Sequence, residues 1–244
     1  MSTTTPTRRT RGLAQLPAVL LVRAAHPRQA VATAAAMAVA AAVAGRPLRE
    51  VTAVGVTVLV GQAILGWGDD LADRRRDARR APGKPLASGL LDPGSVWFTV
   101  VCAVLLVVPL SMSHGPRAGA AYLASLLVAF LGDRLLHARP VSFLPWAVSF
   151  GLLPAFLAYG GWGGVGTDTP PATAMTVLAA ALGVAVHLLL APPGLVDDHE
   201  EGERSLPMLL ALRTGTPRLL LLAGVLTVSL LVALLVTGRT VGLT

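Results

Sequence analysis

Residues 51–77 read VTAVGVTVLVGQAILGWGDDLADRRRD, an apolar run that ends abruptly in acidic and basic side chains. The apolar part, Val51–Trp67, approaches the length of about 20 residues that an α-helix needs to cross the core of a bilayer. Six further apolar runs of comparable length lie elsewhere in the chain. The sequence therefore predicts an all-α integral membrane protein, a bundle of about seven transmembrane helices.

The predicted spans are separated by glycine, proline and charged residues, which break helices or mark loops. They are Ala30–Ala44, Val51–Trp67, Val96–Leu110, Ala118–Leu136, Val141–Tyr159, Ala172–Leu190 and Leu219–Val236. Of the 244 residues, 54% are hydrophobic and only 14% charged, too few charges to cover a soluble domain of this size. We expect residues 12–244 to form a single transmembrane domain, preceded by a disordered tail at 1–11. The segment Leu13–Val22 is interpreted as an amphipathic helix on the membrane surface.

The net charge of +7 is distributed as in the cytoplasmic loops of a membrane protein, and not as in a nucleic-acid-binding protein. Arginines gather at the N-terminus and in short segments between the apolar runs, as the positive-inside rule describes. The chain is accordingly expected in the cell membrane as a multi-pass protein with a cytoplasmic N-terminus. Residues 68–95, 137–140 and 191–218 then lie on the cytoplasmic side, and no nucleic-acid partner is expected.

Acidic residues are concentrated in two places. Of the thirteen Asp and Glu residues, four lie in residues 69–77 and five in residues 197–203. Asp70, Asp73 and Asp77 are spaced i, i+3 and i+7, which places three carboxylates on one face of a helix. Stacked carboxylates repel one another unless something positive balances them, and hard oxygen ligands at this density suit Mg²⁺. Asp197, Asp198 and Glu201 form a second candidate face.

A simpler explanation is that these carboxylates are solvated and paired with arginines on the same helix, as Asp70 and Arg74 would be. Two acidic clusters on the same side of the membrane, in a chain otherwise poor in acid, favour the metal interpretation. Basic residues beside metal-loaded carboxylates are what a diphosphate leaving group requires. Arg80 and Lys84 flank the first cluster in this way.

The first cluster also belongs to a longer motif. Residues 66–89 read GWGDDLADRRRDARRAPGKPLASG. This resembles the first signature of the UbiA superfamily of intramembrane prenyltransferases, with Asp69 at the usual Asn and Lys84-Pro85-Leu86 at the expected distance. Residues 139–155 (RPVSFLPWAVSFGLLPA) are similar to the fifth-span region of actinobacterial members, so the resemblance covers most of the chain.

The resemblance implies a UbiA-like helical bundle around a central cavity, in which Mg²⁺ helps to ionise a polyprenyl diphosphate. The prenyl group then passes to a small acceptor, often an aromatic or quinone-type molecule. The residues implied as catalytic and metal-binding are Asp70, Asp73, Asp77 and Asp198. Those expected to bind substrate are Lys84, Arg80, Arg134, His137, Asp197 and Glu201.

The chain departs from the family pattern in two respects. When the second signature is anchored on Gly202, its last acidic position falls on Asp198, but the two earlier positions fall on Leu190 and Gly194, whose side chains cannot bind a metal. About seven spans replace the usual nine, which leaves room for a homo-oligomer, a partner subunit or a reduced cavity. Two alternatives therefore stay open: a UbiA-type membrane terpene cyclase, and an inactive membrane scaffold or lipid-binding relative.

Two further features are ambiguous. His187 lies within the sixth span, where an ionisable residue is either functional or a neutral histidine hydrogen-bonded to another helix. Phe143, Trp146 and Phe150 share a helical spacing in the fifth span. They either offer π-electrons to a carbocation or simply pack in the membrane.

Overall fold

The computed structural model describes residues 15–161 and 169–241, apart from the side chains of Asp133 and Val241. Throughout this part of the chain the regular elements are helices. They are α1 (Pro17–Ala24), α2 (Pro27–Val43), α3 (Leu48–Ala72), α4 (Arg74–Arg80), α5 (Pro93–Met112), α6 (Pro116–Leu136), α7 (Phe143–Ala158), α8 (Thr173–Leu190), the 3₁₀ turn η3 (Pro192–Gly194), α9 (Leu195–Glu200), α10 (Leu206–Thr214) and α11 (Thr216–Val241). The predicted tail, residues 1–11, lies outside the described residues.

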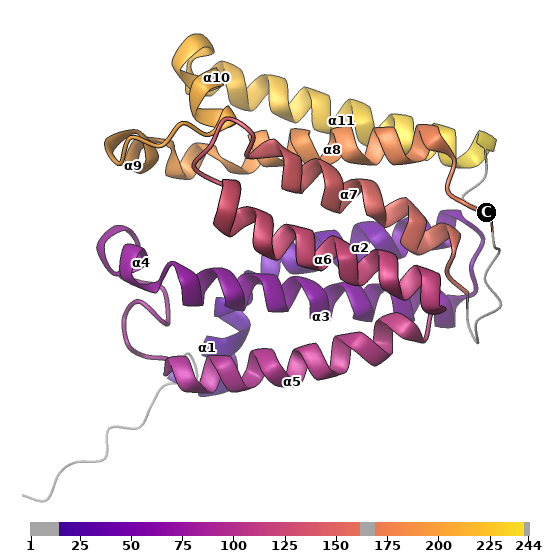
Figure 1. The fold of residues 1–244 in the computed structure, drawn as a ribbon, viewed down its shortest axis with the longest axis horizontal. Helices are drawn as coiled ribbons and strands as arrows, with labels where there is room; N and C mark the ends of the chain where they lie inside the picture. The colour runs from indigo at the N-terminus through magenta and orange to yellow at the C-terminus, as the bar shows by residue number, and fades with distance from the viewer. Residues whose placement is uncertain (1–14, 162–168, 242–244) are drawn as a thin grey trace, which may run out of the picture.

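In the part of the chain that the structure describes there are seven apolar helices. They run side by side along the long axis of the molecule (Figure 1). Five of them, α3, α5, α6, α8 and α11, are long and apolar enough to cross a membrane. The other two, α2 with 17 residues and α7 with 16, are shorter apolar helices. At 1.5 Å per residue they are roughly 25 Å long, close to the thickness of the hydrocarbon core. The predicted all-α integral membrane fold is confirmed.

The helix that carries the first acidic cluster is longer than its apolar run. We expected Val51–Trp67, whereas α3 continues to Ala72 and so includes Asp69 and Asp70. It ends at Asp73, where the backbone has φ −87° and ψ 3°, and α4 begins at Arg74. The prediction that Asp70, Asp73 and Asp77 share one face of a continuous helix is therefore wrong. Asp77 lies on α4, which turns away from the axis of α3 (Figure 1).

The short helix α1 lies across the bundle rather than along it (Figure 1). Its buried residues Leu20 and Ala24 belong to the main hydrophobic core. The indole Nε1 of Trp67 on α3 donates a hydrogen bond of 2.9 Å to the carbonyl of Leu21. The described part of the segment predicted as a surface helix thus belongs to α1, which is packed onto the end of α3.

Close approaches between helices depend on small residues. A Cβ on Gly132 of α6 would lie 2.2 Å from Cβ of Pro145 on α7, so only glycine permits this separation. Around α3 the core is filled by large buried side chains, including Val58, Val96, Tyr122 and Phe156. Burial of this kind excludes water and fixes the helix positions.

The loops that carry the charged motifs lie at one end of the bundle, together with α4, α9 and α10 (Figure 1). The backbone N–H of Arg204 donates to the carbonyl of Ala138 at 3.0 Å, which joins the α9–α10 connection to the α6–α7 loop. From there α11 runs to the opposite end of the bundle (Figure 1). The three predicted loops therefore share one side, and its assignment to the cytoplasm remains a prediction.

Candidate active site

A cavity of about 300 Å³ opens between α2, α3, α6, α7 and the end of α8. Its wall is largely apolar, with three aromatic side chains from α6 and α7: Phe130, Trp146 and Phe150. Polar side chains also line it, namely His26, Gln29, Gln62, Asp69, Arg134 and Ser149. The cavity is thus an apolar space that carries charged groups of both signs.

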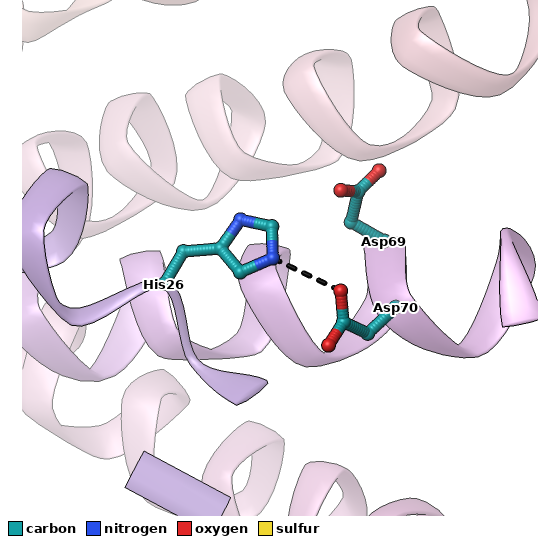
Figure 2. Close-up of side chains that lie close together, drawn as sticks. All are labelled: His26, Asp69 and Asp70. Atoms are coloured by element: carbon teal, nitrogen blue, oxygen red, sulfur yellow. Dashed lines mark hydrogen bonds and ion pairs between the residues drawn. The ribbon is translucent and has the colours of Figure 1, made fainter. Parts of the chain in front are cut away.

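The carboxylate of Asp70 is the best-buried charge near this cavity, with only 2% of its side chain exposed. Its Oδ1 atom lies 3.0 Å from Nε2 of His26, as Figure 2 shows. The ammonium of Lys84 donates to the same oxygen at 3.0 Å and to Oδ2 of Asp77 at 2.8 Å. Lys84 therefore joins the two carboxylates that the break at Asp73 separates.

These contacts shift the ionisation of both basic groups. The hydrogen bond to Asp70 raises the pKa of the His26 imidazole above its ordinary value, more than burial lowers it. Burial lowers the pKa of Lys84, but the hydrogen bonds to Asp77 and Asp70 outweigh it, so the pKa is raised overall. A buried carboxylate is costly unless paired, and here Lys84 and His26 supply that pairing.

His26 was not identified from the sequence, and its placement depends on an unusual corner of the chain. It precedes α2 with φ +49°, a left-handed conformation that is uncommon for residues other than glycine. The preceding residue, Ala25, packs directly against Gly66 of α3. A Cβ on Gly66 would lie 2.7 Å from the carbonyl carbon and oxygen of Ala25. Only a histidine followed by proline marks this corner in the sequence, and that signal is weak.

The first cluster offers suitable donors for a divalent cation. Ligand atoms of His26, Asp69 and Asp70 all lie within 4.8 Å of one another. Asp70 uses Oδ1 for His26 and Lys84, whereas Oδ2 has no hydrogen-bond partner within the described ranges. Carboxylate oxygens, supplemented by phosphate oxygens from a substrate, are the donors that Mg²⁺ prefers. The residues present therefore fit Mg²⁺.

The second cluster has different partners. Asp198 of α9 is engaged by two arginines of α4, by Arg76 at 3.0 Å and by Arg80 at 3.2 Å. Glu201 is bound by the same pair, at 3.3 Å and 2.6 Å. Glu203 lies 2.5 Å from Arg76. The two acidic clusters are thus brought to the same end of the bundle, but the carboxylates of the second are held by arginines.

The other predicted substrate-binding residues are distributed around these clusters. Arg134 lies 3.7 Å above the ring of Phe130 and donates to the carbonyl of Gly68 at 2.6 Å, so it sits at the cavity beside α3. Asp197 is 3.9 Å from Arg80. His137 is 3.8 Å from Glu203 and does not line the cavity.

The contacts of His187 favour the interpretation of a histidine hydrogen-bonded to another part of the bundle. Its Nε2 lies 2.9 Å from Oγ of Ser142, and its ring stacks on Trp146 with centroids 5.4 Å apart. Ser142 in turn accepts a hydrogen bond from the backbone N–H of Leu206. Trp146 and Phe150 line the cavity as the aromatic spacing suggested, whereas Phe143 does not.

Comparison with known proteins identifies the fold and its general chemistry. A family model described as the UbiA prenyltransferase family matches residues 30–244. The chain belongs to this family. No curated protein and no solved structure matches the chain significantly.

Membership of the UbiA family implies prenyltransferase-type activity within the membrane. The matched region contains both acidic clusters and all the cavity-lining residues of α3, α6, α7 and α8. It begins at Ala30, so His26 and α1 precede it. The contact between His26 and Asp70 therefore joins a segment outside the matched region to its first signature.

Proposed function

We propose that this UbiA-family protein is a Mg²⁺-dependent prenyltransferase that ionises an isoprenoid diphosphate and transfers the prenyl group to a small acceptor. The observation that carries the proposal is the position of Asp69, His26 and Arg134 on a largely apolar, aromatic-lined cavity of about 300 Å³. A prenyl diphosphate combines a hydrocarbon chain with a highly charged head. The cavity offers matching surfaces to both parts.

Asp70, Asp73 and Asp77, with Asp69 beside them, are proposed to hold Mg²⁺ at the first cluster. Bound there, Mg²⁺ would neutralise charge on the diphosphate and so make it a better leaving group. Asp198 is proposed as a further metal residue. Its ion pairs with Arg76 and Arg80 would have to be rearranged before it could bind a cation.

The protein's own cations are proposed to bind the diphosphate. Lys84 and Arg134 lie beside the first cluster. Arg80 pairs with Asp197 and Glu201 of the second cluster, and His137 lies 3.8 Å from Glu203; these residues are proposed to take part in substrate binding as well. When the carbon–oxygen bond breaks, the diphosphate leaves with the electron pair. The allylic cation remains beside Trp146 and Phe150, whose ring faces attract positive charge.

Transfer then requires an acceptor that attacks the cation and loses a proton. A small aromatic or quinone-type acceptor is proposed, entering from the lipid bilayer. The aromatic wall also favours a second candidate, a terpene cyclase in which a double bond of the same chain attacks the cation. We propose that the loops of this site face the cytoplasm, since residues 68–95, 137–140 and 191–218 carry ten of the twenty arginine and lysine residues.

The test is turnover by the purified protein reconstituted in liposomes. Geranyl, farnesyl and geranylgeranyl diphosphates are each incubated with Mg²⁺, with and without a panel of hydroxylated aromatic acceptors. Pyrophosphate is measured, and organic extracts are analysed by mass spectrometry. Pyrophosphate with a prenylated acceptor supports the transferase, whereas a cyclised product formed without acceptor supports the cyclase.

The matched control is Asp92→Asn, which changes an exposed carboxylate that caps α5 away from the cavity. This variant is expected to keep wild-type turnover, because Asn also caps helices. Failure of the wild-type protein to release pyrophosphate from any of the three substrates would contradict both enzymatic proposals and favour an inactive relative.

A further inference from the structure

We propose that His26 is a positioning residue of the first metal cluster, acting by orienting the carboxylate of Asp70. This inference rests on the proposed function, because it concerns the same cluster. Its physical basis is the 3.0 Å contact between His26 Nε2 and Asp70 Oδ1 (Figure 2). Hydrogen-bond partners that orient a ligating carboxylate commonly affect metal affinity or activity by about 10- to 100-fold.

The contact fixes one side of the carboxylate. His26 and Lys84 both engage Oδ1 of Asp70, from different segments of the chain. In the described part of the protein, Oδ2 is left without a hydrogen-bond partner. A carboxylate held in this way has little rotational freedom to lose when its other oxygen binds a cation.

The corner that carries His26 is built around α3. Ala25 fits against Gly66, and Trp67 donates a hydrogen bond to Leu21 in α1. Both α3 residues lie within one turn of Asp70. The same short stretch of helix thus supplies the carboxylate and fixes the segment that orients it.

The left-handed conformation of His26 agrees with this assignment. A non-glycine residue at φ +49° costs free energy and persists where surrounding contacts enforce it, often at functional sites. Glycine or asparagine would adopt this conformation with less strain. Neither could place a donor at the distance of the imidazole Nε2.

The test measures binding of Mn²⁺, a substitute for Mg²⁺, to the full-length protein in lipid nanodiscs by electron paramagnetic resonance. Three variants are compared. His26→Ala removes the imidazole, His26→Gln keeps an N–H donor at a similar reach, and His26→Gly removes the imidazole while accommodating the positive φ. Melting temperatures in the same nanodiscs check that each variant is folded.

We expect about 10- to 100-fold weaker Mn²⁺ binding for His26→Ala and His26→Gly, and a loss of less than about threefold for His26→Gln. Binding within threefold of wild type in folded His26→Ala would overturn the proposal. If His26→Gly kept wild-type binding while His26→Ala lost it, the loss would come from backbone strain and the proposal would also be overturned. A spectrum with ¹⁴N coupling from a directly bound imidazole would make His26 a ligand and contradict the positioning role.

This outcome is separate from that of the proposed function. If wild-type protein binds Mn²⁺ and the variants behave as expected, the role of His26 stands even if no prenyl substrate is turned over. If pyrophosphate is released normally while folded His26→Ala binds Mn²⁺ like wild type, the proposed function survives and the role of His26 does not.

Discussion

The two acidic clusters lie at the same end of the bundle and differ in the cations that balance them. Asp70 of the first cluster is paired with a lysine and a histidine, whereas Asp198 of the second is paired with two arginines. A lysine ammonium is a compact charge on a flexible stem, and a guanidinium is a rigid fork that matches carboxylates. The first arrangement leaves a carboxylate that a divalent cation can use, while the second fastens α9 to α4.

The two clusters also differ in their position relative to the cavity. The first cluster adjoins the cavity through Asp69 and His26, and none of the acidic residues of α9 lines that cavity. The two clusters have a similar density of acidic residues, but only the first lies against the apolar cavity. This difference leads to the ranking of effects below.

The largest effect is expected for Asp70→Asn. The substitution keeps the shape of the side chain and removes the charge that a cation would share with the diphosphate, a contribution of several kcal/mol. Pyrophosphate release should fall by about a thousandfold. The melting temperature should be measured in parallel, since Asp70 is buried with charged partners. Wild-type turnover in this variant would remove the first cluster from the mechanism.

Asp198→Asn is expected to have a smaller effect. Because Asp198 already neutralises Arg76 and Arg80, its loss disturbs a supporting network as well as a proposed metal residue. Turnover should decrease by about 10- to 100-fold, measured under the same conditions as for Asp70→Asn. Equal losses in the two variants would mean that the clusters are equivalent metal sites and would break the comparison.

A still smaller effect is expected from the aromatic wall. Trp146→Leu keeps the site apolar and removes one of the aromatic rings that line the cavity. Cation–π contacts contribute about 0.5–2 kcal/mol, so turnover should fall by roughly 2- to 30-fold. Product analysis is the sharper measurement, because a less well-stabilised cation should yield more alcohol by reaction with water. Phe143→Leu, on the same helix but outside the cavity, is the matched control.

The smallest effect is expected on stability, from the ion pairs that join α9 to α4. Arg76→Gln and Asp198→Asn, made singly and together, should show a coupling of about 1 kcal/mol in the free energy of unfolding in detergent. Arg75→Gln, an exposed arginine on the same helix, should be additive with Asp198→Asn. Additivity in the Arg76 cycle would show that the ion pair contributes nothing to stability.

The sequence predicted the membrane helices well, because a helix that crosses a bilayer needs a long apolar run and such a run can be recognised without knowing tertiary contacts. The run Val51–Trp67 identified α3, although hydropathy underestimated its length because the last turn is charged. The break at Asp73 was missed, since the carboxylate spacing fits a continuous helix equally well. Local pattern thus determined which segments are helical but not where the charged ends bend.

The partners of the charged residues were not predictable in the same way. Arg76 meets Asp198 across 122 positions of sequence, and His26 meets Asp70 across 44. Such contacts follow from helix packing, for example from the fit of Ala25 against Gly66, and no local spacing encodes them. The first signature predicts where the chemistry lies, whereas the fold determines which carboxylates remain available for it.

The most direct test of the difference between the clusters is Mn²⁺ binding without diphosphate, compared between wild-type protein, Asp70→Asn and Asp198→Asn in the same nanodiscs. Because the first cluster adjoins the cavity and the second is held by arginines, Asp70→Asn should weaken binding at least about tenfold. Asp198→Asn should stay within about threefold of wild type. Weakened binding in Asp198→Asn with normal binding in Asp70→Asn would contradict the account.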